Sequence, residues 1–268
     1  MASQRVTTER STTLLDAALA AAHGGAEYVR SRESDRAQLE VREKQAADFV
    51  SDVDTGAELR IREVLDRMAP GSLVVGEEMS PTASTAGETV FVVDPLDGTT
   101  NFLHGFPAYS VSIGALSDGV IVAGVVLNIP YGDLYTATLG GGAFHNGAAI
   151  HVSSVSKPNR ALIGTGFPFK NLEFIERYVR QFEAMTRAQS GIRRAGSAAL
   201  DLAWVAAGTF DGFWENRLAP WDIAAGLLLV REAGGRVTDL EGRDIVPTHS
   251  PIVASNGLLH DWLLASLK

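Results

Sequence analysis

The sequence predicts a protein of the mixed α+β and α/β class. Apolar runs of strand length dominate residues 90–137, and Asn146-Gly147, a strong hairpin turn, follows them. After Ser153 strand patterns alternate with helical ones, which is typical of α/β architecture. The chain has 268 residues, 46% of them hydrophobic, so it can bury the core of one large domain or of two closely joined ones. We expect two subdomains, residues 1–150 and 151–268.

In the first half, apolar residues at helical spacing predict helices over residues 14–29 and 54–68. Short apolar runs predict strands at residues 38–41, 73–75, 90–93, 110–116, 120–127, 134–138 and 143–144. Polar and small residues predict loops at 44–51 and 80–88. Gly140-Gly141-Gly142 is interpreted as a hairpin bend, because His145 replaces the last glycine of a nucleotide-binding G-x-G-x-x-G loop.

The second half alternates between the two kinds of element. Strands are expected at residues 161–164, 236–240 and 252–254. Helices are expected at residues 175–185, 198–207 and 223–232, the last of them ended by Gly234-Gly235. Asn256 is expected to cap a final helix that runs to Leu263.

The segment from Asp94 to Phe102 carries the strongest functional signal. It follows an apolar run, so Asp94 and Asp97 lie where a buried strand ends, and the carbonyl of Leu96 can face the same point. Oxygen donors this close repel one another unless a hard cation such as Mg²⁺ lies among them. The amides of the next residues, from Gly98 on, suit a phosphate group. The simpler alternative is a strand end followed by a turn that a threonine caps.

Two more carboxylates lie at the ends of expected elements. Glu77 follows a short strand, and Asp222 stands at the start of a helix. Taken alone, Asp222 is most simply a residue that stabilises the helix dipole, and Glu77 a solvated charge. Because all four carboxylates lie at element ends rather than on exposed faces, together they indicate a metal site.

Composition narrows the classes of function. The net charge of −9 argues against nucleic-acid or membrane binding, but not against an anionic substrate held through a cation. The chain has no cysteine, which excludes disulfides and thiolate nucleophiles. No secretion signal precedes residues 14–22, an apolar stretch too short to span a bilayer, so we expect a cytoplasmic protein.

Three acidic segments resemble the signature motifs of the inositol monophosphatase family. They are Gly76-Glu77-Glu78 and residues 94–102 and 221–226, and residues 193–203 and 212–215 are also similar to that family. The resemblance covers residues 14–263 in the expected order. It implies a layered α/β/α/β/α sandwich of the sugar phosphatase type, a homodimer, and a Mg²⁺-dependent, lithium-sensitive phosphoric monoester hydrolase.

The resemblance also implies roles for single residues. Two to three Mg²⁺ ions would be held by Glu77, Asp94, the carbonyl of Leu96, Asp97 and Asp222. Thr99, with Glu77, would orient and deprotonate the nucleophilic water, Asp54 would bind Thr99, and Lys44 would lie in a loop beside the metals.

Substrate contacts follow from the same resemblance. The phosphate would meet the amides of Gly98 and Thr99, and the sugar would meet Gly196, Ser197, Ala198, Glu215 and Asp222. The substrate favoured is myo-inositol 1-phosphate. The alternatives are histidinol phosphate, fructose 1,6-bisphosphate or a nucleotide phosphate and, from another class, a regulatory binding protein that keeps a vestigial site.

Overall fold

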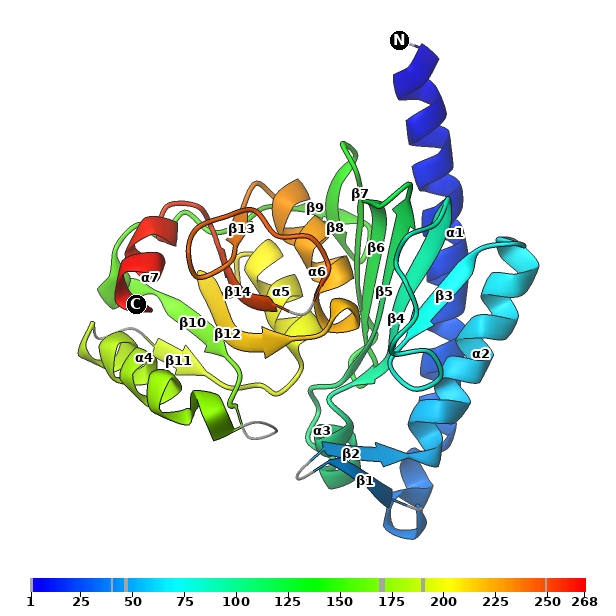
Figure 1. The fold of residues 1–268 in the computed structure, drawn as a ribbon, viewed down its shortest axis with the longest axis horizontal. Coiled ribbons are helices and arrows are strands. Elements are labelled where there is room, and N and C mark those ends of the chain that lie inside the picture. The colour runs from blue at the N-terminus through cyan, green and yellow to red at the C-terminus, as the bar shows by residue number, and fades with distance from the viewer. Residues whose placement is uncertain (1, 40, 46–47, 169–171, 189–190, 249) are drawn as a thin grey trace.

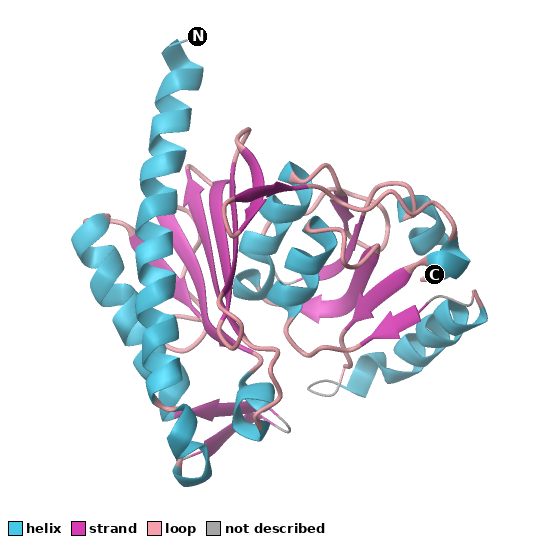
Figure 2. Ribbon diagram, turned by 180° about the vertical axis from the view of Figure 1, so that it is seen from behind, coloured by secondary structure: helices cyan, strands magenta, loops and turns pink. Residues whose placement is uncertain are grey.

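Five layers stack on one another in the computed structural model, which describes residues 2–39, 41–45, 48–168, 172–188, 191–248 and 250–268 (Figure 1). Helices α1 (Ala2–Ser31) and α2 (Asp52–Met68) cover the outer face of a seven-stranded sheet. Helices α5 (Ala198–Ala206) and α6 (Pro220–Glu232) lie between that sheet and a five-stranded one. Helices α4 (Ile175–Arg187) and α7 (His260–Ser266) cover the far side (Figure 2). The expected α/β/α/β/α sandwich is confirmed.

The seven-stranded sheet follows chain order. Only its first pair, β3 and β4, is parallel, and the other pairs are antiparallel. Its strands are β3 (Leu73–Gly76), β4 (Thr89–Asp97), β5 (Ser110–Ser117), β6 (Val120–Asn128), β7 (Asp133–Thr138), β8 (Gly142–His145) and β9 (Ala148–Ile150).

The five-stranded sheet has the order β11-β10-β12-β14-β13. Strand β10 is parallel to both of its neighbours, whereas β14 is antiparallel to both of its own. The strands are β10 (Leu162–Thr165), β11 (Gly191–Arg193), β12 (Gly212–Leu218), β13 (Arg236–Thr238) and β14 (Ser250–Ser255). The division into subdomains at residue 150 stays a prediction.

Strand β4 is an unbroken apolar run because helices cover both of its faces. Val90 and Val92 pack in the core that α5 and α6 form, while Phe91 and Val93 pack against α1 and α2. A strand covered on one side only would alternate apolar and polar residues.

Small residues let α6 lie very close to the seven-stranded sheet. A Cβ added at Gly114 would lie 2.6 Å from the Cβ of Ala224, and one at Gly124 would lie 3.0 Å from the carbonyl oxygen of Ala225. On its other side, a Cβ at Gly226 would lie 2.4 Å from Leu202 of α5. This close packing fixes the start of α6 relative to the end of β4.

The β7–β8 turn is the hairpin bend expected for Gly140-Gly141-Gly142. Its amides bind a carboxylate of the protein itself: Gly140 N–H donates to Oε1 of Glu232 at 2.8 Å, and Gly142 N–H donates to Oε2 at 2.9 Å. Glu232 is the last residue of α6. The turn therefore anchors the end of that helix.

Several expected elements differ from the structure. The predicted loop at residues 44–51 is wrong, because β1 (Val41–Gln45) and β2 (Asp48–Ser51) pair as antiparallel strands there. The predicted strand at residues 38–41 is wrong at its start, since Gln38 ends a 3-10 helix, η1 (Glu33–Gln38), and β1 begins only at Val41. Strand β1 has one apolar residue, Val41, and the two apolar residues of β2, Phe49 and Val50, are adjacent, so hydrophobic alternation does not mark these strands.

Two helices also start elsewhere than expected. Helix α1 begins twelve residues earlier than expected, at Ala2, and α7 begins at His260, so Asn256 is not its N-cap. The Asn256 side chain instead accepts from the Leu259 amide at 3.1 Å and donates to the carbonyl of Val155 at 2.7 Å. Among the described residues, no helix is both long and apolar enough to cross a membrane.

Candidate functional site

The end of β4 places two carboxylates on one face of the seven-stranded sheet. Asp94 pairs with Ser112 and Asp97 pairs with Ser110, so three steps along β4 oppose two steps along β5. This bulge contains Pro95, which could not donate to a regular ladder, and it absorbs one residue of the strand. Asp97 therefore faces the same side as Asp94, towards α5 and α6.

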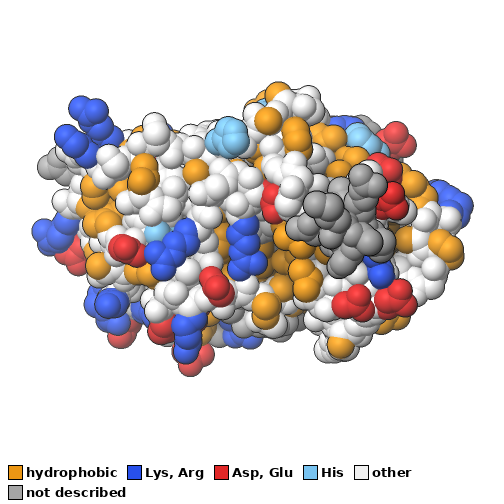
Figure 3. Space-filling view, turned by 90° about the horizontal axis from the view of Figure 1, so that it is seen from above, with side chains coloured by type: hydrophobic (Ala, Val, Ile, Leu, Met, Phe, Trp, Pro, Cys, Tyr) orange, Lys and Arg blue, Asp and Glu red, His pale blue; other side chains and the backbone are white. Residues whose placement is uncertain are grey.

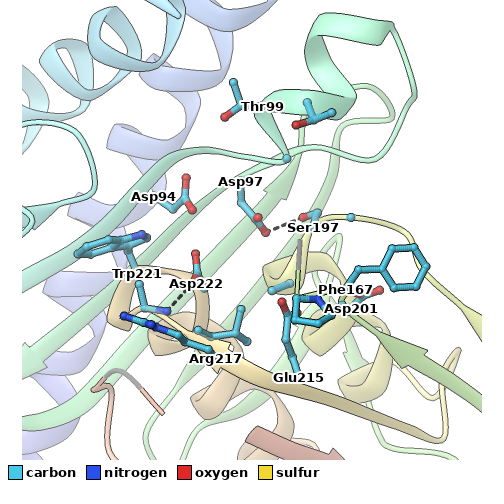
Figure 4. Close-up of a pocket in the computed structure, with 18 of the residues that line it drawn as sticks. Asp94, Asp97, Thr99, Phe167, Ser197, Asp201, Glu215, Arg217, Trp221 and Asp222 are labelled. Carbon is cyan, nitrogen blue, oxygen red and sulfur yellow. Dashed lines mark hydrogen bonds between the residues drawn. The ribbon is translucent and has the colours of Figure 1, made fainter. Parts of the chain in front are cut away.

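Helix α6 brings a third carboxylate to the other two. Asp222 lies in its first turn and accepts from the Ala219 amide at 2.6 Å, which satisfies one of the free N–H groups at the helix start. Ligand oxygens of Asp94, Asp97 and Asp222 all lie within 4.8 Å of one another (Figure 4). Asp222 therefore does stabilise the start of its helix, which is the simpler role considered for it. The same hydrogen bond directs its side chain towards the cluster.

Glu77 comes to the same cavity from β3. Its amide donates to the carbonyl of Val93 at 3.2 Å, which extends the pairing with β4 by one residue beyond Gly76. Glu77 lines the cavity together with the three aspartates and Leu96. Four acidic residues that are far apart in the sequence thus meet at one place.

The electrostatics of this cluster fit a cation. Burial raises the pKa of Asp94 well above its usual range, and the charges of Glu77, Asp97 and Asp222 raise it further. Asp94 is 1% exposed, so water cannot offset this repulsion. Carboxylate oxygens with a backbone carbonyl beside them are the donors that hard divalent cations prefer. The residues present therefore fit a divalent metal ion.

Thr99 and Asp54 form a hydrogen-bonded pair beside the cluster. The Thr99 hydroxyl donates to Oδ1 of Asp54 at 2.7 Å and also lies 3.2 Å from the carbonyl of Leu96. Oδ2 of Asp54 accepts from both the amide and the hydroxyl of Ser51, at 2.8 and 2.7 Å, in the capping box that starts α2. Burial raises the pKa of Asp54 to about 6, although these hydrogen bonds lower it.

The Thr99 hydroxyl can bind Asp54 because Gly98, and not Thr99, is the N-cap residue of the helix that follows. Gly98 is the N-cap of α3 (Thr99–His104) and has a φ of +99°, which favours glycine. A Cβ there would also lie 2.9 Å from the carbonyl oxygen of Ala108. The alternative in which Thr99 only caps a turn is thus wrong, since its hydroxyl binds Asp54.

The N-terminus of α5 forms the opposite wall. The Ser197 hydroxyl donates to Oδ2 of Asp97 at 2.7 Å, and the Ala199 amide donates to the same oxygen at 2.8 Å (Figure 4). Ser197 also accepts from the Leu200 amide as the N-cap of α5. Gly196 and Ala198 line the cavity beside it. Ser197 therefore orients Asp97, a role the sequence did not indicate.

Glu215 reaches the cavity from β12 because a glycine makes room for it. A Cβ added at Gly166, just after β10, would lie 2.0 Å from the Glu215 carboxylate. Glu215 lies across the cavity from Asp94, as Figure 4 shows. The cavity holds about 870 Å³ and opens between the two sheets.

Three more cavity residues were not singled out from the sequence. The Arg194 guanidinium lies 5.2 Å from the centre of the Phe167 ring, an attractive cation–π distance. Asp201 of α5 is 2% exposed, and burial, followed by the charges of Glu215 and Asp97, raises its pKa well above the usual range. Its Oδ1 has no hydrogen-bond partner among the described residues. Only the resemblance of residues 193–203 pointed to this region.

Lys44 is the one expected site residue that these contacts do not place. It lies on β1, and its side chain is outside the described part of the structure. Figure 3 shows the distribution of charge on one face of the molecule. On that face lysine and arginine side chains are scattered among acidic ones and form no broad basic surface.

Comparison with known proteins agrees with this geometry. The model of the inositol monophosphatase family matches residues 10–268. An inositol-1-monophosphatase of Rhizobium meliloti is 48% identical over 204 residues, which cover 76% of this chain and 77% of that protein. The Nus factor SuhB of Pseudomonas aeruginosa is 40% identical over 260 residues, which cover 95% and 96%.

A solved structure gives the same result for the fold. The crystal structure of the extragenic suppressor protein suhB from Bartonella henselae superposes with a TM-score of 0.89 at 40% identity, and covers 95% of this chain and 98% of that one. The family match spans both sheets and all the acidic residues of the cavity. The chain therefore belongs to the inositol monophosphatase family, whose members are metal-dependent phosphatases.

Proposed function

We propose that this phosphatase hydrolyses the phosphate ester of a small polyol or sugar, with myo-inositol 1-phosphate as its preferred substrate and Mg²⁺ as its cofactor. The observation that carries the proposal is that the aspartate cluster lines one cavity together with Thr99, whose hydroxyl donates to Asp54 behind it. A cation site alone would suit many functions. A cation site beside a threonine hydroxyl that already donates to a carboxylate suits hydrolysis.

The acidic residues would hold the metal ions. Glu77, Asp94 and the carbonyl of Leu96 would bind one ion, and Asp94, Asp97 and Asp222 would bind a second, with a third reached by Glu77 through water. When bound, Mg²⁺ would supply the three needs of this slow reaction: neutral charge on the phosphoryl oxygens, a lower pKa of water and stabilisation of the leaving alkoxide. No cysteine or serine nucleophile is then required.

Thr99 and Asp54 would handle the proton of the attacking water. Because the Thr99 hydroxyl donates to Asp54, its oxygen lone pairs are turned towards the cavity and can accept from a water molecule. Glu77 would orient the same water from the other side. The amides of Gly98 and Thr99 would bind the phosphate, and Lys44 would contribute a positive charge nearby.

The sugar side would be read by α5 and β12. Gly196, Ser197 and Ala198 line this wall with backbone groups, and Glu215 and Asp222 offer carboxylate acceptors to hydroxyl groups. A polyol presents many such hydroxyls, so this wall favours it over an apolar leaving group. The homodimer expected from the family is part of the proposal, and light scattering coupled to size-exclusion chromatography tests it.

Phosphate release from a panel of esters tests the substrate. Myo-inositol 1-phosphate, histidinol phosphate, fructose 1,6-bisphosphate and a nucleoside monophosphate are compared with and without Mg²⁺. We expect the highest kcat/KM for the inositol ester and no release without metal. Faster hydrolysis of another ester would reassign the substrate. No release from any of them would support the alternative, a regulatory binding protein with a vestigial site. That alternative is tested because one relative is named as a Nus factor.

A further inference from the structure

Glu58 is a buried carboxylate to which the proposed reaction gives no role. It lies in the middle of α2 and is 0% exposed. Arg62, one turn later, donates from Nε to its Oε1 at 2.9 Å. A charge removed from water this completely persists only when it is paired and hydrogen-bonded. The partners of its other oxygen lie in the turn that carries Glu77.

Oε2 of Glu58 accepts two backbone amides of that turn. The Glu78 amide donates to it at 2.8 Å and the Met79 amide at 3.3 Å. The Glu78 N–H belongs to the peptide group directly after Glu77, and the Glu77 N–H, bound to Val93, belongs to the group directly before it. With both flanking peptide planes held, the direction of the Glu77 side chain is fixed by the backbone.

The same carboxylate explains the glycine before Glu77. A Cβ at Gly76 would lie 2.2 Å from Oε1 of Glu58, so any other residue would push the carboxylate away from the turn. Ser80 closes the arrangement: its hydroxyl accepts from Arg62 at 2.5 Å and from the Gly76 amide at 3.1 Å, and donates to the carbonyl of Val74 at 2.8 Å. Every hydrogen-bonding position of that hydroxyl is thereby used.

We propose that Glu58, paired with Arg62, is a positioning residue that fixes the Glu77 turn and so sets the affinity of the site for a divalent cation. The inference rests on the proposed function, in which Glu77 is a metal ligand. A ligand that is already aimed loses little freedom on binding, and partners that orient ligands typically change metal affinity by about 10- to 100-fold. Glu58 itself lies behind the backbone of this turn and does not line the cavity.

A substitution that keeps the shape tests this. In Glu58→Gln the amide nitrogen must face either Arg62 or the two backbone N–H groups, all of which are donors, so at least one contact is lost. We expect isothermal titration calorimetry with Mn²⁺, without substrate, to show binding about tenfold weaker than in the wild type. Glu63→Gln is the matched control, because Glu63 lies on the same helix in an exposed pair with Arg60 at 2.9 Å, and its affinity should not change.

The outcomes separate this inference from the proposed function. Glu77→Gln, measured in parallel, should also weaken Mn²⁺ binding. If Glu77→Gln weakens it while folded Glu58→Gln binds like the wild type, the positioning role is refuted and the metal site stands. If Glu77→Gln itself binds Mn²⁺ like the wild type, Glu77 is not a ligand. The positioning role of Glu58 and the metal site proposed with Glu77 then both fail. Should Glu58→Gln not fold, Ser80→Ala decides: about threefold weaker binding supports the proposal, and unchanged affinity overturns it.

Discussion

Replacing Asp54 with asparagine should stabilise the protein at neutral pH and yet remove its activity. Asp54 is 1% exposed, and its pKa in the folded protein is about 6, against roughly 4 in an unfolded chain. A carboxyl whose pKa is raised on folding favours the folded state when protonated. That contribution is complete below pH 4 and is lost as the pH rises through 6.

The size of the effect follows from the two pKa values. Ionisation of Asp54 costs the folded state about 1 kcal/mol at pH 4.5 and about 3 kcal/mol at pH 8, by proton linkage. Asparagine does not titrate. It can also keep the local bonds: its oxygen accepts from Ser51, and its NH₂ group donates to Thr99, whose hydroxyl turns to the carbonyl of Leu96. The gain in stability over the wild type should therefore grow by about 2 kcal/mol between these pH values.

The reversed hydrogen bond explains the loss of activity. When the asparagine amide of the Asp54→Asn variant is the donor, one lone pair of Thr99 is occupied and its proton is directed at the carbonyl of Leu96, which cannot take it up as a carboxylate does, so the hydroxyl cannot relay a proton from water. We expect kcat to fall roughly 100-fold, as for other general-base substitutions.

Urea unfolding in EDTA at pH 4.5 and pH 8 measures the stability change, because a bound cation would alter the influence of Glu77 on Asp54. Asp52→Asn is the control, since Asp52 is half-exposed and pairs with Arg32 at 3.0 Å; its effect should be small at both pH values. A stability difference for Asp54→Asn that does not grow with pH would refute the raised pKa. An unchanged kcat would refute the role of the pair.

Three further outcomes are expected. Asp94→Asn should lower kcat at least 1000-fold, because it removes a carboxylate that would bind two metal ions in the proposed function. Its melting temperature without metal should rise, since repulsion with Glu77, Asp97 and Asp222 is relieved. Near-normal turnover would contradict the metal assignment. Gly166→Ala should displace the Glu215 carboxylate, which lies where the new Cβ would be, and raise KM for inositol 1-phosphate about tenfold. The KM for p-nitrophenyl phosphate should change little, because its leaving group has no further hydroxyl. Equal changes in KM for both esters would show that the effect does not come from Glu215. EDTA should abolish phosphate release and Mg²⁺ restore it, and Li⁺ at fixed Mg²⁺ should inhibit; full activity in EDTA would exclude metal catalysis.

The parts of the fold that could be predicted are those whose burial leaves a pattern in the sequence. The run 90–93 is apolar on both faces because helices cover both, and the acidic residues at its end could be recognised as a site. The β1–β2 pair could not be predicted, since its strands are short and show no alternation of apolar and polar residues. Strand β12 was missed for a similar reason: Glu215, Asn216 and Arg217 interrupt its apolar start.

The residues behind the site could not be predicted for a different reason. Glu58 and Arg62 have the i, i+4 spacing of an ordinary surface pair on a helix, and only the tertiary structure shows that Glu58 is fully buried under the Glu77 turn. Likewise, nothing in the sequence around Ser197 indicates that its hydroxyl donates to Asp97 rather than to a substrate. Local patterns find the groups that do chemistry more readily than those that hold them in place.

Helix α6 is fastened to the seven-stranded sheet at both of its ends. The carbonyl of Trp221, in its first turn, accepts from the Ser112 hydroxyl of β5 at 3.2 Å, and Glu232, its last residue, is held by the amides of the β7–β8 turn. The helix is about 20 Å long and behaves as a stiff rod on this scale. A change in the length or sequence of that distant surface turn would therefore strain the close packing of α6 on the sheet, and with it the position of Asp222. The β7–β8 turn is in this way linked to the cation site, although none of its residues lines the cavity.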